Sequence, residues 1–181
     1  LDCVLYRLDL GEFFRAQRDW WEYSPTGRPI REWRVPVEAP LNKTQYVLLD
    51  LAADGGTLEP GLYLLEVHAP GVQYDNWSHR KILAVSDYNL TLKASQNELW
   101  VWATDLATGR PVSGLKLTAY NYDGTTSFGA QTTDANGLAR FDAGGGYYDT
   151  LYVVGWQPFA LGGSGWDWSA VIRFWYFWLE P

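Results

Sequence analysis

The sequence predicts an all-β fold made of two tandem antiparallel β-sandwich domains, and three observations predict it. Apolar and polar residues alternate over many short segments, which is typical of strands with one buried face. Clusters of Gly, Pro, Asn and Asp separate these segments at short intervals, as turns between strands do. Aromatic residues make up 17% of the chain, and their flat rings favour a pleated surface over a helix.

The first half of the chain is predicted to form one domain over residues 1–86. The sequence leaves open whether this domain is truncated at its N-terminus. Its composition favours strands at residues 3–8, 31–37, 46–51, 62–68 and 79–85. Pro36 places the second of these strands at an edge or an end of the sheet. Residues 11–21 form the only segment in which we expect a helical turn or two, and residues 24–29 are expected to be a loop.

The alternating pattern restarts after Ser86-Asp87, which we predict as the boundary of a second domain over residues 87–181. Asp134-Ala135-Asn136-Gly137 predicts a hairpin turn, because Asn-Gly readily adopts the positive φ that such turns require. The glycine-rich segment 159–165 is expected to be a loop that precedes a final aromatic strand within residues 171–179. The remaining strands of this domain are expected at residues 90–94, 99–105, 115–120, 130–133, 138–141 and 151–155.

The charge balance argues against a nucleic-acid partner. The chain has 21 acidic and 14 basic side chains, a formal charge of −7, and no basic stripe that could neutralise phosphates. No run of about 20 apolar residues is present in the sequence, so we expect no membrane span in this chain. Methionine is absent, even at position 1, which indicates a fragment of a longer polypeptide.

No constellation of catalytic residues is recognisable, and we predict that the chain is not an enzyme. General-base catalysis near neutral pH usually needs a histidine, and His68 and His79 lie at the ends of predicted strands in separate segments. The turn that begins at Asp134 resembles the start of a calcium loop, but Gly145 stands where the closing acidic residue is needed. We therefore expect no catalytic residue, no cofactor and no metal. The lone Cys3 lies in an apolar run and is predicted to be a buried thiol.

Four tryptophans near the C-terminus are the candidate site residues. Exposed aromatic rows bind sugars by stacking on the apolar face of the ring, but aromatic rings also fill cores and domain interfaces. Trp175 and Trp178 lie three apart in a predicted strand and would point to opposite faces, which argues against one flat row. Packing is the favoured interpretation and ligand binding is the alternative. The four residues are Trp166, Trp168, Trp175 and Trp178.

Two segments of the second half are specific enough to compare with a known family. Residues 99–112 read Leu-Trp-Val-Trp-Ala-Thr-Asp-Leu-Ala-Thr-Gly-Arg-Pro-Val, and residues 133–141 read Thr-Asp-Ala-Asn-Gly-Leu-Ala-Arg-Phe. In combination they resemble a macroglobulin-type domain of the bacterial alpha-2-macroglobulin family. Residues 4–9 and 58–67 resemble the preceding domain of those chains. The resemblance covers most of the chain as short motifs, and implies macroglobulin-like sandwiches related to immunoglobulin and fibronectin-III folds.

The resemblance implies that the chain is part of a much larger parent protein, which is secreted or periplasmic and can be anchored to a membrane. Members of the family trap proteases, and in many of them a reactive thioester captures the attacking enzyme. The thioester needs a cysteine followed closely by Glu-Gln, whereas Cys3 precedes Val4-Leu5. The implied role is a non-catalytic scaffold, with the neighbouring domains of the parent and its target proteases as partners. An extracellular carbohydrate-binding or adhesive module is the alternative.

Overall fold

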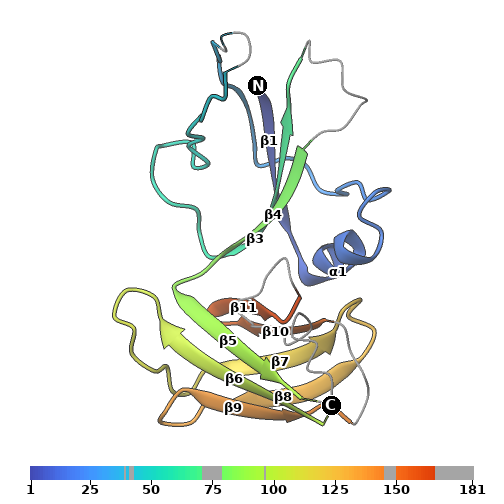
Figure 1. The fold of residues 1–181 in the computed structure, drawn as a ribbon, viewed down its shortest axis with the longest axis vertical. Helices are drawn as coiled ribbons and strands as arrows, with labels where there is room; N and C mark the ends of the chain where they lie inside the picture. Colours follow the sequence, from blue (N-terminus) through green and yellow to red (C-terminus); the bar gives the residue numbers. More distant parts are fainter. Residues whose placement is uncertain (39, 41–42, 71–78, 96, 145–149, 166–181) are drawn as a thin grey trace, which may run out of the picture. The chain divides into compact units, whose positions relative to one another are not determined.

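The computed structural model describes residues 1–38, 40, 43–70, 79–95, 97–144 and 150–165. The chain divides into two compact units, each of which is seen as a separate group of strands in Figure 1. The first unit comprises residues 1–16 and 21–85, and the second comprises residues 17–20 and 86–181. Strands dominate the described residues, and the strand pairings within both units are antiparallel. The predicted all-β antiparallel class is therefore confirmed.

The first unit contains a four-stranded sheet in the order β2-β1-β3-β4. β1 lies in the interior of the sheet, where Cys3 pairs with Trp33 on one side and with Val67 on the other. The short β2 forms one edge and ends two residues before Pro36, in agreement with the edge position predicted for that proline. The strands are β1 (Asp2–Leu8), β2 (Arg31–Arg34), β3 (Gly61–His68) and β4 (His79–Val85).

A single helix, α1 (Leu10–Arg18), follows β1 in the described residues, and its residues 10–16 belong to this unit. Its nine residues form about two and a half turns, slightly more than the turn or two that the sequence predicts. Asp9 caps its N-terminus, because the Asp9 carboxylate accepts a 2.7 Å hydrogen bond from the backbone N–H of Glu12. Phe13, Phe14 and Ala16 are buried, so the helix is held by its apolar face.

The strand predicted over residues 46–51 is wrong, because this segment has no assigned strand in the structure. Tyr46 is 96% exposed and Leu48 is 88% exposed, so their side chains lie largely in solvent. The backbone carbonyls of Asp50 and Ala52 accept hydrogen bonds from the guanidinium of Arg31. Composition gave this segment a high β-propensity, but a strand also needs a neighbouring strand to pair with.

The second unit contains two sheets, which Figure 1 shows as two layers. A three-stranded sheet has the order β5-β6-β9, and a four-stranded sheet has the order β11-β10-β7-β8. The first sheet consists of β5 (Tyr88–Ala94), β6 (Glu98–Asp105) and β9 (Leu138–Asp142). The second consists of β7 (Lys116–Asn121), β8 (Ser127–Thr132), β10 (Leu151–Trp156) and β11 (Phe159–Gly163).

One apolar core joins the two sheets of the second unit. Along β6, Leu99, Val101 and Ala103 are buried while the residues between them face outward, as the period of a strand requires. Both sheets supply residues to the core, which is the defining property of a sandwich. The cluster comprises Leu90, Leu92, Leu99, Val101, Ala103, Leu115, Leu117, Ala119, Ala139, Phe141, Leu151, Val153 and Ala160.

The loop predicted over residues 159–165 is wrong in its first part, because residues Phe159–Gly163 form strand β11. Gly162 is a packing residue here and not a sign of a loop. A Cβ at this position would lie 2.6 Å from the side chain of Leu92 and 2.8 Å from that of Leu90. Only glycine therefore lets β11 approach β5 this closely.

The turn predicted at residues 134–137 forms, but it does not join two strands of a hairpin. Gly137 has a φ of 75°, and its N–H donates to the carbonyl of Asp134 at 3.0 Å. The strands on either side, β8 and β9, belong to different sheets. Asn-Gly predicts a change of direction, and the sheet that receives the next strand is decided by the core.

Candidate functional site

The two histidines first considered for chemistry lie at neighbouring positions of the first sheet, because His79 pairs with Val67. Successive residues of a strand point to opposite faces, so the two side chains do not share a face. His68 and His79 are both exposed, at the end of β3 and the start of β4. Cys3 is 1% exposed, which confirms the predicted buried thiol, and burial raises its pKa. Among the described residues, no group of three or more His, Cys, Asp or Glu side chains could hold a metal ion. Trp166, Trp168, Trp175 and Trp178 lie outside the described residues.

The connection between the two units is short and is bonded to the second unit. β4 ends at Val85 and β5 begins at Tyr88, so that only Ser86 and Asp87 lie between them. The Ser86 hydroxyl donates a 2.7 Å hydrogen bond to the carbonyl of Phe159 and accepts one from the N–H of Tyr88. The carbonyl of Asp87 accepts a 2.8 Å bond from the N–H of Leu106.

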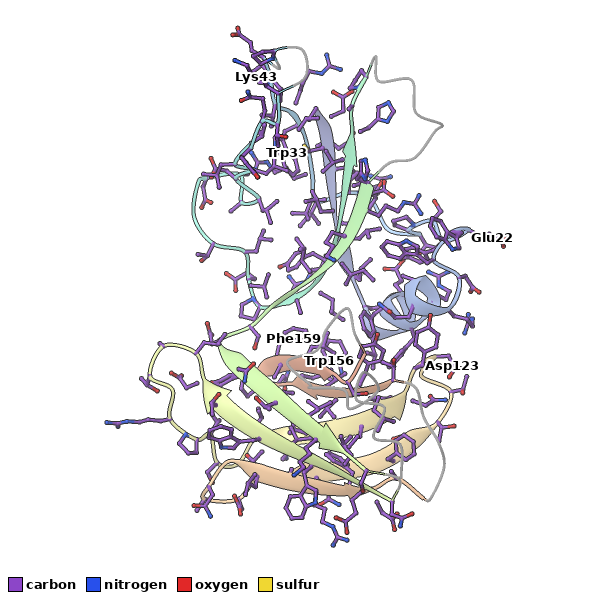
Figure 2. All side chains as sticks on the ribbon, viewed as in Figure 1. Glu22, Trp33, Lys43, Asp123, Trp156 and Phe159 are labelled. Carbon is purple, nitrogen blue, oxygen red and sulfur yellow. The ribbon has the colours of Figure 1, made fainter. Side chains whose placement is uncertain are left out.

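The strands that receive Ser86 belong to the edge hairpin of the four-stranded sheet. Phe159, labelled in Figure 2, opens β11, and its ring lies 5.7 Å from that of Trp156 at the end of β10. β10 and β11 are paired along five residue pairs, from Tyr152 with Gly163 to Trp156 with Phe159. The acceptor of the Ser86 hydroxyl is therefore part of a paired strand and not of a free loop.

The outer face of the three-stranded sheet carries two exposed tryptophans. Trp100 is 40% exposed and Trp102 is 45% exposed, and both project from the central strand β6 away from the core. We call this surface the tryptophan face, and define it by the outward residues of the three strands. These are Thr91 and Lys93 on β5, Glu98, Trp100 and Trp102 on β6, and Leu138, Arg140 and Asp142 on β9.

Both indole rings of the tryptophan face are fixed by hydrogen bonds. Trp100 Nε1 donates to a carboxylate oxygen of Glu98 at 2.9 Å, and Trp102 Nε1 donates to the carbonyl of Asn136 at 3.2 Å. The guanidinium of Arg140 pairs with Glu98 and lies 5.9 Å from the centre of the Trp100 ring. The hydrogen bond from Trp100, and then that from Arg140, lowers the pKa of Glu98. Glu98 therefore accepts from both neighbours as a carboxylate.

An open hollow of about 420 Å³ lies at one end of the tryptophan face. It is lined by Lys93, Ala94, Ser95, Glu98 and Trp100, so an ammonium, a hydroxyl and a carboxylate border the indole. The Ser95 hydroxyl already bonds to the backbone of Glu98, and the Glu98 carboxylate already accepts from Trp100 and Arg140. The indole ring adds apolar contact area to this polar border.

Sequence reasoning did not select Trp100 and Trp102 as site residues, although it predicted their strand. The signal was available in the alternation of residues 98–105. Leu99, Val101 and Ala103 occupy one side of the strand, so a buried odd-numbered face places Trp100 and Trp102 outside.

A family model matches part of the second unit. Residues 85–154 match the model of the "Bacterial alpha-2-macroglobulin MG3 domain". The resemblance to bacterial alpha-2-macroglobulins is confirmed. The match begins at the end of β4 and runs to β10, so it includes Ser86, Asp87 and the tryptophan face. No curated protein matches the chain.

Solved structures of alpha-2-macroglobulins share the fold of this chain at 18% identity. The native Escherichia coli protein spanning domains MG0-NIE-MG1 aligns over 84% of this chain and 50% of its own, with a TM-score of 0.65. The same protein spanning NIE-MG1 aligns over 84% and 77%, with a TM-score of 0.66. The Salmonella alpha-2-macroglobulin mutant Y1175G aligns over 84% and 9%, with a TM-score of 0.57.

These alignments show that the matched structures are longer than this chain. The chain spans half the length of the first matched structure and about a tenth of the Salmonella chain. Its relatives in structure are thus domains within multi-domain proteins. None of the helices in the described residues is both long and apolar enough to cross a membrane.

Proposed function

We propose that this chain supplies two non-catalytic structural domains, residues 1–86 and 87–181, to a larger alpha-2-macroglobulin-like protease trap. The parent protein would act in the periplasm or outside the cell, with target proteases and its own neighbouring domains as partners. The two described units, which meet between residues 85 and 86, support this division. The family match over residues 85–154 supports the assignment of the second domain.

The observation that carries the proposal is the connection at Ser86 and Asp87. A flexible linker leaves two domains free to move independently, and its residues are usually solvent-exposed and unbonded. Here β4 pairs with β3 up to Val85, and the next two residues are both hydrogen-bonded to the second unit. Ser86 and Asp87 are therefore held by the second unit and are not free linker residues, which favours a structural role for this connection.

The acidic side chains of the second unit support a structural role as well. Asp105 accepts hydrogen bonds from the backbone and hydroxyl of Thr108, and Asp123 accepts the same pair from Thr125. These bonds lower the pKa of both carboxyls. The carboxylates are thereby used to close turns, in the manner of Asx turns, and are not directed at a common point.

The proposal is tested in the complete parent polypeptide by lengthening the connection. Insertion of Gly-Ser-Gly-Ser between Ser86 and Asp87 should reduce the fraction of protease that is trapped. A trapped protease still cleaves a small peptide but no longer cleaves a large protein, so the ratio of the two activities measures trapping. The matched control carries the same insertion between Asp123 and Gly124, in the turn between β7 and β8.

The two possible failures of this experiment are distinct. If the parent polypeptide leaves the protein-cleaving activity of every protease unchanged, the proposed function is wrong. If the parent traps proteases and both insertions are tolerated equally, the scaffold role of the connection is wrong while the family role stands. The expected result is a loss of trapping for the insertion after Ser86 alone, with circular dichroism showing that both variants are folded.

A further inference from the structure

We propose that the tryptophan face of the second unit is a binding site for an uncharged polysaccharide. The site is formed by Trp100 and Trp102, with the hollow beside Trp100 as its polar end. This inference does not depend on the proposed function, because it rests only on one face of one sheet. Four observations carry it: the position of the rings, their fixation, the balance of charge and the chemistry of the hollow.

The two rings are placed to contact successive sugar units. Trp100 and Trp102 are two residues apart on β6, so their Cα atoms are about 7 Å apart on the same face. The C–H groups on the apolar side of a pyranose carry a slight positive charge, and the face of an aromatic ring is negative. Two half-exposed indoles on one face of the strand therefore offer two contact positions along one extended chain of sugars.

Both rings are held in place by hydrogen bonds, which favours a ligand-binding role for the two tryptophans over the alternative that they are exposed without a function. Each indole N–H is already bonded, one to Glu98 and the other to the carbonyl of Asn136. A ring held in place loses little conformational freedom when a ligand stacks on it, so more of the contact energy appears as affinity. The sequence thus combines an exposed apolar surface with side chains that keep it in one orientation.

The balance of charge indicates an uncharged ligand. Glu98 and Arg140 pair with each other, and the other ionic side chains of the face are one cation, Lys93, and one anion, Asp142. The face therefore has a formal charge of zero, and its potential favours neither an anionic nor a cationic polymer. Sugar hydroxyls both donate and accept, and the hollow is lined by Lys93, Ser95 and Glu98. The Ser95 hydroxyl is already bonded to the backbone of Glu98, and the Glu98 carboxylate to Trp100 and Arg140.

The same features argue against a protein as the occupant. The buried centre of a protein interface is depleted of Lys, Glu and Asp, although aromatic residues and Arg are enriched there. Trp100 has Lys93 as one cross-strand neighbour and Glu98 two residues away. Covering this row with another protein would desolvate several charges, whereas a hydrated sugar chain leaves them in contact with hydroxyls and water.

The binding experiment uses the 181-residue chain with hydroxyethyl cellulose, a soluble uncharged β-1,4-glucan, and with polygalacturonate, an acidic polysaccharide. We expect saturable quenching of tryptophan fluorescence and retardation in an affinity gel with the first polymer and neither effect with the second. Trp102→Ala should weaken binding at least tenfold. The matched control is Trp156→Ala, because Trp156 is 46% exposed in the same unit but lies on β10; its binding should match that of the unchanged chain.

The outcomes separate the proposal from its rivals. Absence of saturable binding to hydroxyethyl cellulose overturns it, as does an equal loss in Trp102→Ala and Trp156→Ala. Binding to polygalacturonate alone overturns the argument from charge, and thereby the ligand class. A dimer in sedimentation that Trp102→Ala dissociates would show that a second copy occupies the face. If Trp102→Ala lowers the melting temperature, Trp102→Phe keeps a smaller ring and should bind with intermediate affinity.

Discussion

The two units of this chain close their cores in different ways. In the second unit, two sheets face each other and share one apolar cluster, so that each strand has a partner layer. In the first unit, the described residues contain one sheet, the helix α1, and a long segment without assigned strands between β2 and β3. The same alternating sequence pattern therefore supports a complete sandwich in one half and a sheet with irregular neighbours in the other.

The difference shows that strand patterning does not predict how the segments between strands are held. In the second unit, the turns are fixed by their own residues, such as Asp134, whose carboxylate accepts from the N–H groups of Asn136 and Leu138. In the first unit, the segment before β3 is held from a distance by the side chain of Arg31. Local turn chemistry can be predicted from neighbouring residues, whereas a contact of this length along the chain cannot.

The largest expected effect comes from truncating one buried phenylalanine in each unit. Phe141→Ala leaves a cavity between two sheets whose strands are fixed by their hydrogen-bond ladders, and should lower the free energy of unfolding by about 4–5 kcal/mol. Phe13→Ala should lower it by about 3 kcal/mol, because a single helix can shift to fill part of the cavity. Urea denaturation followed by fluorescence measures both, with the exposed Leu106→Ala as a near-neutral control.

An equal loss for the two variants would show that the helix of the first unit is as rigidly placed as a sandwich strand. A smaller loss for Phe141→Ala than for Phe13→Ala would contradict the comparison itself. Either result would mean that the number of layers does not decide how well a core tolerates a cavity in this chain.

The second prediction concerns two glycines of the second unit that share a left-handed conformation. Gly137 and Gly109 have φ values of 75° and 67°, so any other residue is strained at both positions. A Cβ at Gly137 would lie 2.5 Å from the backbone oxygen of Ala103, whereas a Cβ at Gly109 meets nothing within 4 Å. Gly137→Ala should cost about 3 kcal/mol and Gly109→Ala about 1 kcal/mol.

Thermal and urea unfolding of these two variants would test whether the 134–137 turn is packed against β6. Equal losses would mean that only the backbone conformation matters there and that the contact with Ala103 is easily relieved. The comparison is sharp because both substitutions add the same methyl group to the same backbone region.

The sequence was sufficient to predict most strands of the second unit, for a physical reason. β6 alternates cleanly between core and solvent, and Gly, Asn and Asp mark its neighbouring turns, so pattern and turn chemistry agree. The prediction failed where local composition pointed to one structure and packing or strand pairing required another. Glycines at 162 and 163 indicated a loop, although Gly162 is required by the approach of β11 to β5. Residues 46–51 had the composition of a strand without a partner to pair with.

The type of residue that forms the candidate site could be predicted from the sequence, but its position in the chain was not predicted. Tryptophans were expected to form an interface or a ligand surface. The predicted site residues were the tryptophans near the C-terminus, where they are densest in the sequence. Whether a side chain is exposed depends on which face of its strand packs on the core. On β6 the core face is that of Leu99 and Val101, so Trp100 and Trp102 face the solvent. Reading the buried face first and then the outward one would have found them.

A third prediction concerns the distant tie in the first unit. Arg31→Ala removes the hydrogen bonds from the guanidinium to Asp50 and Ala52, each of which involves a charged donor. Losing them should favour local opening of the segment by about 1–2 kcal/mol, or roughly five- to thirtyfold. Chymotrypsin should then cleave after Tyr46 or Leu48 faster by a similar factor.

The matched control for this prediction is Arg34→Ala on the same strand. Arg34 pairs with Asp2 and not with the segment before β3, and its side chain is 78% exposed. Cleavage of this variant should proceed at the rate of the unchanged chain. Faster cleavage in both variants would mean that β2 as a whole, and not the Arg31 guanidinium, holds the segment.

The smallest expected effect is a pH dependence on the outer surface of the second unit. The pKa of Glu98 is lowered in the folded chain, first by the hydrogen bond from Trp100 and then by that from Arg140. A depressed pKa contributes stability above the ordinary glutamate value of 4.5, and this contribution is lost as the pH falls through the folded-state pKa. Glu98→Gln should therefore melt slightly below the unchanged chain at pH 7, and the difference should shrink as the pH is lowered below 4.5. Arg140→Gln and Trp100→Phe should each reduce this pH dependence, because each removes one of the two side-chain hydrogen bonds to the carboxylate. A pH dependence that is unchanged in both variants would show that neither bond controls the carboxylate that borders the tryptophan face.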